Sequence, residues 1–279
     1  MLIDGMKNKV QKINNHLPVK NSLGEGLFIF NNMIAWVDID RFELNLYQQN
    51  NHLKRKLPIQ ATTVLDIDND SLTLSSLNND CFEIGRFNIF TNEYETMISH
   101  KYLVDNSYLF RTNDAVMLDR ERFLIGTMVK NKTIDQPGDL IYLDSSSAIL
   151  IDKNFIPNSF ILLDSGEILI SDSFEKIVWK YRFLDFSEGR FEKEIFHKFD
   201  EYVPDGGCLI DQKIYITIYN KSLICVFDLC GNIINELLIP LTHPTNCKYD
   251  KNNKSLWITS AMPSSNPNEM DGNIISVSL

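Results

Sequence analysis

Six short segments of this sequence resemble one another and recur at nearly regular intervals. Each is a run of about six β-branched, aromatic and small residues, the length and composition of a β-strand. Their first residues lie 38, 51, 45, 46 and 42 positions apart. The six segments are Ile34–Ile39, Leu72–Leu77, Phe123–Met128, Ile168–Ser173, Ile214–Tyr219 and Leu256–Ala261.

A second strand-like run follows each segment after a short polar turn. These runs are Phe42–Tyr47, Phe82–Phe87, Leu140–Ser145, Ile177–Phe183, Leu223–Asp228 and Ile274–Leu279. Further candidate strands flank the pairs, such as Phe160–Leu163 before Ile168 and Lys193–Phe199 after the fourth pair. Four strands in a repeat of about 45 residues are typical of a β-propeller blade. The sequence therefore predicts an all-β, six-bladed β-propeller with four antiparallel strands per blade, a single domain over residues 1–279.

The last repeat stops after its third strand, at Leu279. The segment Val10–Leu17 precedes the first strand of the first repeat and has no assigned partner. We expect residues 1–22 to form a closure segment whose strand completes the last blade and removes an exposed sheet edge. The alternative is that this segment is a frayed tail.

The charge and composition exclude several classes of partner. The chain has 27 basic and 37 acidic residues, a net charge of −10, which disfavours nucleic acids and anionic membranes. No run approaches the ~20 apolar residues that span a bilayer, and the first 20 residues lack the apolar core of a signal peptide. The five cysteines have no CxxC spacing. We therefore expect a cytoplasmic protein with reduced thiols, as a monomer or weak dimer.

Polar residues occupy matching places in the repeats. Glu25, Asn113, Asn158 and Asp205 each lie 11 residues before a residue of the strand-like segment of their own repeat, while Ala61 and Thr245 stand at the remaining two places. Because the innermost strands of a propeller meet at its axis, these side chains should face one axial pocket. The alternative is that Asn and Asp simply make turns where strands begin.

Two carboxylates in one pocket repel each other unless a cation or a proton intervenes. Glu25, Asn158 and Asp205 offer an all-oxygen set, which suits Ca²⁺, Mg²⁺ or Mn²⁺. Zn²⁺ is also compatible with carboxylate ligands. The sequence thus predicts one divalent cation, with Ca²⁺ the first candidate.

The local sequences around these residues form an ordered series. In order they are LGEG (Leu23–Gly26), AWVDI (Ala35–Ile39), RTND (Arg111–Asp114), PNS (Pro157–Ser159), PDGG (Pro204–Gly207) and HPTN (His243–Asn246). Together they resemble the family of senescence-marker protein, gluconolactonase and luciferin-regenerating enzyme, which includes regucalcin. The resemblance runs from about Leu23 to the C-terminus.

The resemblance implies a hydrolase that opens sugar lactones with the help of one divalent cation. It implies that Glu25, Asn158 and Asp205 bind the metal, that Arg111 and Asn113 contact the substrate, and that Asp205 is also the catalytic base. The chain departs from the family at Leu27, where Pro is usual, and at Ser159 and Ala115, where Gly is usual. Glycine accepts positive φ and close backbone approach better than Ser or Ala, so we expect altered loops at the mouth.

Two other functions are compatible with the sequence, a binding propeller without turnover and a protein-interaction propeller. The loss of Gly and Pro around the mouth favours a propeller that binds a cation or a sugar without turnover, whereas an interaction propeller has less support because it needs no polar axial set. His243 is expected to serve a turn, with substrate contact as the alternative. Asp172 is equally compatible with a turn and with a place behind the pocket. No GxSxG or HExxH pattern is present in the sequence.

Overall fold

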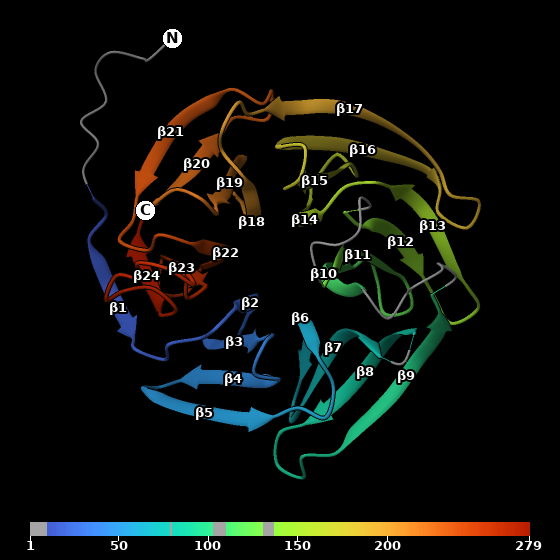
Figure 1. The fold of residues 1–279 in the computed structure, drawn as a ribbon, viewed down its shortest axis with the longest axis horizontal. Helices are drawn as coiled ribbons and strands as arrows, with labels where there is room; N and C mark the ends of the chain where they lie inside the picture. The colour runs from blue at the N-terminus through green and yellow to red at the C-terminus, as the bar shows by residue number, and fades with distance from the viewer. Residues whose placement is uncertain (1–9, 79, 103–109, 131–136) are drawn as a thin grey trace.

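The computed structural model describes residues 10–78, 80–102, 110–130 and 137–279. These residues form six antiparallel sheets of four strands each, arranged around a central axis (Figure 1). The prediction of a six-bladed β-propeller is confirmed. Among the described residues, no helix is long and apolar enough to cross a membrane.

The first three blades are consecutive in the chain, and each begins with its innermost strand. Their strands are β2 (Gly24–Phe30), β3 (Met33–Asp38), β4 (Glu43–Gln48) and β5 (Asn51–Lys56) in blade 1; β6 (Ala61–Asp68), β7 (Ser71–Asn78), β8 (Cys81–Asn88) and β9 (Tyr94–Lys101) in blade 2; and β10 (Phe110–Met117), β11 (Phe123–Val129), β12 (Asp139–Leu143) and β13 (Ala148–Lys153) in blade 3.

The last three blades follow the same order, except that the chain begins in the outer strand of the sixth. Their strands are β14 (Pro157–Leu162), β15 (Ile168–Asp172), β16 (Ile177–Asp185) and β17 (Arg190–Lys198) in blade 4; β18 (Pro204–Ile210), β19 (Lys213–Ile218), β20 (Leu223–Phe227) and β21 (Ile233–Leu238) in blade 5; and β22 (Pro244–Asp250), β23 (Ser255–Ser260), β24 (Ile274–Ser278) and β1 (Ile13–Leu17) in blade 6.

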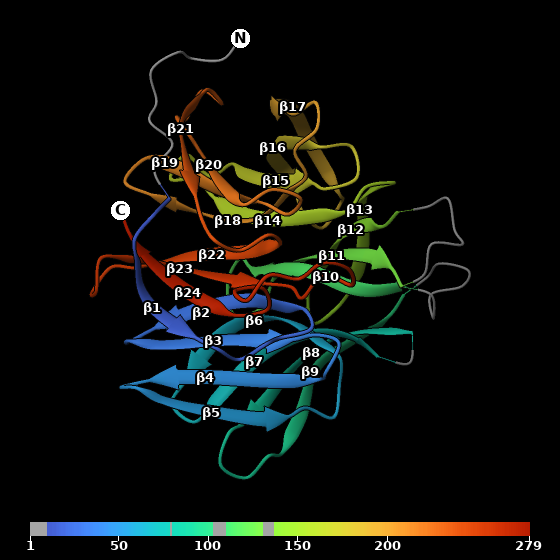
Figure 2. The same ribbon diagram turned by 60° about the vertical axis from the view of Figure 1, so that its left-hand side comes forward.

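The two ends of the chain meet in blade 6. Strand β1 pairs antiparallel with β24, from Ile13 opposite Val277 to Leu17 opposite Ile274. Figures 1 and 2 both show β1, in blue, lying beside β24, in red. The predicted closure by Val10–Leu17 is confirmed, and Val10 itself bridges to blade 5. The first nine residues of the expected closure segment lie outside the described residues.

The hydrophobic core lies between neighbouring blades, because each sheet packs with both of its faces against the sheets of the adjacent blades. All five residues of β12 and of β20 are buried, for example. A core cluster joins blades 5 and 6 through side chains that include Ile224, Leu256 and Ile258. Full burial of such a side chain contributes about 1.5–3 kcal/mol.

Each innermost strand contains a β-bulge within its first few residues. The register between the first two strands shifts by one residue after Ala61, Thr112, Asn158, Pro204 and Pro244, and likewise after Glu25. Bulges turn side chains away from the regular alternation of a strand and are common beside functional sites. Here they lie at the places where the sequence predicts the axial pocket.

Candidate active site

The bulges place the predicted site residues in one position of their blades. Glu25, Asn113, Asn158 and Asp205 each directly follow a residue that pairs with the second strand at the same place in its blade. These pairs are Gly24 with Asp38, Thr112 with Thr127, Pro157 with Asp172 and Pro204 with Ile218. In all four blades the pairing after the bulge resumes in the same register, with one extra residue on the innermost strand. The four residues therefore share one register position, as their spacing in the sequence predicts.

Two of the bulges have a left-handed residue directly after the site residue. Gly26 has φ +58° and Ser159 has φ +60°. A Cβ on Gly26 would lie 2.6 Å from the Thr62 carbonyl oxygen, so glycine is required there. Ser159 keeps a conformation that glycine would adopt more easily. The backbone at position 159 is therefore left-handed even though the chain has Ser where the family usually has Gly.

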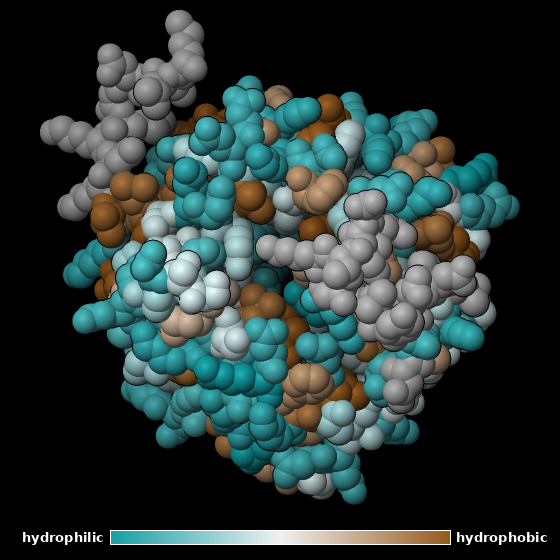
Figure 3. All heavy atoms as spheres, in the orientation of Figure 1, coloured by the Kyte–Doolittle hydropathy of each residue, from teal (hydrophilic) through white to brown (hydrophobic). Residues whose placement is uncertain are grey.

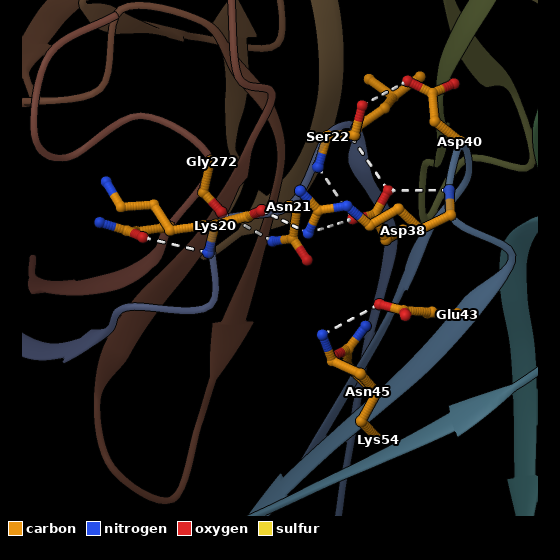
Figure 4. A network of polar contacts seen from close by, with 12 residues as sticks. Lys20, Asn21, Ser22, Asp38, Asp40, Glu43, Asn45, Lys54 and Gly272 are labelled. Atoms are coloured by element: carbon orange, nitrogen blue, oxygen red, sulfur yellow. Dashed lines mark hydrogen bonds and ion pairs between the residues drawn. The ribbon is translucent and has the colours of Figure 1, made fainter.

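The start of β2 is held by a polar network (Figure 4). The Asp38 carboxylate accepts hydrogen bonds from the backbone N–H groups of Ser22, at 2.8 Å, and Leu23, at 3.2 Å. Ser22 also donates its hydroxyl to Asp40, and Asn21 donates its side-chain amide to the Gly272 carbonyl. These contacts fix the three residues that lead to Glu25.

A chain of hydrogen bonds joins Arg111, Asn113 and Asn158. The Arg111 guanidinium donates to Asn113 Oδ1 at 2.9 Å, and Asn113 Nδ2 donates to Asn158 Oδ1 at 2.9 Å. Asn158 Nδ2 in turn donates to Ser173 Oγ at 2.9 Å. This chain fixes the amide orientation of Asn158, whose oxygen faces Asn113 and whose nitrogen faces away.

The two predicted carboxylates lie close enough to disturb each other. Burial, and after it the charge of Asp114, raises the pKa of Glu25 to about 8, against the opposing effects of the Gly26 N–H and of Arg111. Burial, followed by the charges of Glu25 and Asp114, raises the pKa of Asp205 well above its usual range. Three carboxyl groups from blades 1, 3 and 5 therefore share one electrostatic environment, and the charge of Arg111 offsets the raised pKa values of Glu25 and Asp205 only in part.

The structure adds residues that the sequence did not single out for the site. Asp114 is 7% exposed; its carboxylate accepts hydrogen bonds from the Thr63 hydroxyl at 3.2 Å and the Ser159 N–H at 3.1 Å. Burial is the main cause of its raised pKa. Asp114 follows Asn113 directly in RTND, so the motif contained this signal.

Asp40 and Tyr219 also belong to this end of the channel. Burial lowers the pKa of Arg111, and the charges of Glu25, Asp40 and Asp205 oppose that shift. Burial raises the pKa of Tyr219 to about 12, with Asp205, Glu25 and Asp40 contributing. These two residues come from loops and strand ends of blades 1 and 5, and no local pattern in the sequence marks them.

Two further candidates take turn and packing roles. Asp172 accepts hydrogen bonds from the N–H groups of Ile156, Phe174 and Glu175, so its side chain serves the turn after β15. His243 accepts or donates a hydrogen bond with Thr242 Oγ1 at 2.9 Å, and its ring meets the edge of Tyr219 with centroids 4.9 Å apart. Leu27 is buried, and Ala115 pairs with Ile125 after its bulge.

The donor set fits a hard divalent cation. Glu25, Asp205 and Asn158 bring two carboxylates and an amide oxygen, and burial followed by repulsion between carboxylates raises the pKa of both acids, a shift that a bound cation would oppose. The buried Oδ1 of Asn246, whose side chain lowers the pKa of the neighbouring Glu25, has no partner among the described residues. Among those residues, no three His, Cys, Asp or Glu side chains are placed to hold a metal, so the amide oxygen is needed.

The site lies at one mouth of the axial channel. Glu25, Asn158 and Asp205 are each the second residue of an innermost strand, so they lie where these strands begin. Figure 3 shows a hollow at the centre of the ring, bordered by hydrophilic residues in teal and apolar residues in brown.

Comparisons with known proteins agree with this fold. The closed ring is similar to the calcium-binding protein regucalcin from Agrobacterium tumefaciens, at 18% identity and a TM-score of 0.83 over 97% of this chain and 95% of that one. It is also similar to luciferin-regenerating enzyme, at 16% identity and a TM-score of 0.81 over the same shares of the two chains. A gluconolactonase from Xanthomonas campestris matches at 12% identity and a TM-score of 0.71, over 96% of this chain and 91% of that one.

At these identities the structural matches establish the fold alone, and no curated protein matches the sequence. The family described as "SMP-30/Gluconolactonase/LRE-like region" matches residues 23–262, which include every predicted site residue. With most of its length matched, the chain belongs to the SMP-30/gluconolactonase/LRE-like family.

Proposed function

We propose that this protein is a metal-dependent hydrolase that opens sugar lactones at the axial site. The observation that supports it most is the meeting of Glu25 and Asp205, two carboxyl groups with raised pKa values, beside the oriented amide of Asn158. Such a site gains from a divalent cation, and Ca²⁺ suits its oxygen ligands best. The family, and the gluconolactonases among the similar structures, support the reaction class.

Glu25, Asn158 and Asp205 would hold the cation, which when bound supplies Lewis-acid stabilisation of negative charge on a carbonyl oxygen. Asn113 holds the Asn158 oxygen in place through its own Nδ2. Arg111 donates from Nη1 to Asn113 and Thr112, and no hydrogen bond from its other guanidinium nitrogens to a described residue is present, so their N–H groups can donate to hydroxyl groups of a sugar.

Asp205 is the proposed base. Its carboxylate orients a water and accepts the proton that the water loses as it attacks the lactone carbonyl carbon. The ring C–O bond then breaks, and the protonated Asp205 returns the proton to the ring oxygen, which leaves as the hydroxyl group of the open-chain acid. The neighbouring Glu25 and Asp114 raise its pKa, which makes it a better proton acceptor than an exposed Asp. A bound cation would lower the pKa of Asp205 again, so binding the metal would make Asp205 a weaker base.

The test is acid release from a panel of five- and six-membered sugar lactones. Each lactone is offered to the metal-free protein, to the protein with Ca²⁺, Mg²⁺, Mn²⁺ or Zn²⁺, and to each of these with excess chelator. The proposal expects turnover that needs a cation and stops with chelator. Turnover that ignores the chelator contradicts the role of the metal.

A propeller that only binds a cation or a sugar is the second candidate. Ser159 favours it, because a side chain now stands at a left-handed position of the mouth, where its hydroxyl is buried without a partner among the described residues. Stoichiometric cation binding without turnover of any lactone would support this second function.

A further inference from the structure

We propose that Cys208 and Cys247 form a redox-active dithiol, which a hydroperoxide oxidises to a disulfide between blades 5 and 6. The proposal does not rest on the proposed function, because neither cysteine belongs to the candidate active site. Cys208 lies on β18 and Cys247 on β22, the innermost strands of these two blades. The two strands pack side by side near the axis (Figure 1).

Both thiols point into the interface between the two blades. Cys208 and Cys247 belong to the same buried cluster, with residues of both blades around them. Cys247 Sγ reaches across to the carbonyl oxygen of Tyr215 at 3.8 Å, and Tyr215 is the strand partner of Cys208. The neighbouring Cys247 thiol is the first cause of the lowered pKa of Cys208.

An oxidant can reach Cys208 through the far end of the channel. The later halves of the innermost strands line a cavity of about 800 Å³, and Cys208 is one of its walls. Lys248 lines the same cavity, and its charge favours a thiolate at Cys208. Cys247 is fully buried behind Cys208, where burial raises the pKa of its thiol.

These positions assign an order to the reaction. The Cys208 thiolate attacks the outer oxygen of ROOH, the O–O bond breaks, and ROH leaves with the proton from the thiol, so Cys208 becomes a sulfenic acid. The Cys247 sulfur then attacks the Cys208 sulfur, and the hydroxide leaves as water with the Cys247 proton. In total, two thiols and ROOH give one disulfide, ROH and H₂O, and a thiol reductant reverses the change.

The other three cysteines provide controls. Cys230 is exposed on the turn after β20, Cys225 is buried in a different cluster, and Cys81 lies in blade 2. If exposure alone governed oxidation, Cys230 would react before Cys208. We expect instead that Cys208 and Cys247 form a disulfide, because a sulfenic acid forms an intramolecular disulfide only with a neighbouring thiol.

The test treats the reduced full-length protein with hydrogen peroxide, blocks the remaining thiols with N-ethylmaleimide and maps the peptides without reduction. Trypsin followed by cleavage after Glu236 separates Cys247 from Cys225 and Cys230. We expect Cys208 and Cys247 in one cross-linked peptide pair, lighter by two hydrogens, with three of the five thiols still free. Dithiothreitol should restore all five.

Variants fix the order of the steps. Cys247→Ser should stop at a Cys208 sulfenic acid that dimedone traps, Cys208→Ser should lose the cross-link, and Cys230→Ser should keep it. Circular dichroism shows whether each variant is folded. Oxidation at Cys230 while Cys208 and Cys247 of the folded wild-type protein stay reduced would overturn the proposal, whether or not the variants fold.

Discussion

Asn113 Nδ2 donates to Asn158 Oδ1 at 2.9 Å, and this bond links blade 3 to blade 4 at the mouth of the channel. It determines which atom of Asn158 faces the site. Because such supporting bonds orient metal ligands, Asn113 has a second proposed role besides contact with the substrate, the orientation of Asn158.

Asn113→Ala should therefore weaken calcium binding by about 10- to 100-fold, as the loss of a bond that orients a ligand typically does. Isothermal titration calorimetry of the metal-free protein measures this change. Asn235→Ala, at an exposed position of β21, is the matched control and should bind as the wild type does. Equal affinity in Asn113→Ala would show that Asn158 needs no such support or binds no metal.

The stability of the metal-free protein should depend on the ionisation of Glu25. Its pKa is raised from 4.5 to about 8 in the folded protein, so the folded state holds this proton more tightly than the unfolded state. The sign follows directly: the stabilising contribution is complete below about pH 4.5 and is lost as the pH rises toward 8.

Thermal melting from pH 5 to 8 measures this loss. Glu25→Gln, which cannot ionise, should flatten the fall in melting temperature of the metal-free protein, and calcium should offset the fall in the wild type. Calcium affinity itself should increase over the same range, because the cation competes with the proton. A Glu25→Gln variant whose pH profile matches the wild type would contradict the assignment.

Ser159 and Gly26 occupy equivalent left-handed positions, yet their replacements should act in opposite directions. Ser159→Gly should raise the free energy of unfolding by up to about 1 kcal/mol, because it relieves a strained φ and removes a buried hydroxyl that has no partner among the described residues. Gly26→Ala should lower it by at least about 2 kcal/mol, because the new Cβ meets the Thr62 and Thr63 backbone at 2.6 Å.

Urea denaturation of both variants measures these free energies. If Gly26→Ala were as stable as the wild type, the left-handed bulge would not be required in blade 1.

Strand β1 should carry a substantial part of the stability of the ring. Deletion of residues 1–18 removes the pairing from Ile13 to Leu17 and leaves β24 as an open edge. We expect the melting temperature to fall by roughly 5–10 °C, since each kcal/mol corresponds to about 2–4 °C for a chain of this size. An unchanged melting temperature would mean that closure does not stabilise the propeller.

The repeat predicted the blades because each unit carries its own strand pattern, from Ile34–Ile39 to the last repeat. The repeat also predicted that Glu25, Asn158 and Asp205 lie together, since residues at matching places in a propeller meet at its axis. What could not be predicted depends on contacts between blades. The strand pattern of the sequence does not mark the bulges that follow Thr112 and Pro204, and only the folded ring brings Tyr219 to Arg111.

Asp172 shows why the role of a carboxylate at the end of a strand could not be predicted from the sequence. It ends a strand in the same way as Asp38 does. Both carboxylates accept hydrogen bonds from backbone N–H groups of the turn that leads to the next strand, Asp38 from Arg41 and Asp172 from Phe174 and Glu175. A carboxylate at a strand end is therefore ambiguous in sequence, because turns and binding sites both favour it.

The rate of lactone hydrolysis by Asp205→Asn at saturating calcium tests the central proposal most directly. The change keeps the size of the side chain and removes the charge that the proposed mechanism uses as base and ligand. Asp228→Asn, at a half-buried position just before the turn between β20 and β21, is the control and should retain full activity. We predict that Asp205→Asn folds as the wild type does and loses at least about 1,000-fold in kcat/KM, a loss of about 4 kcal/mol in transition-state stabilisation. Activity of Asp205→Asn within tenfold of the wild type would contradict the account.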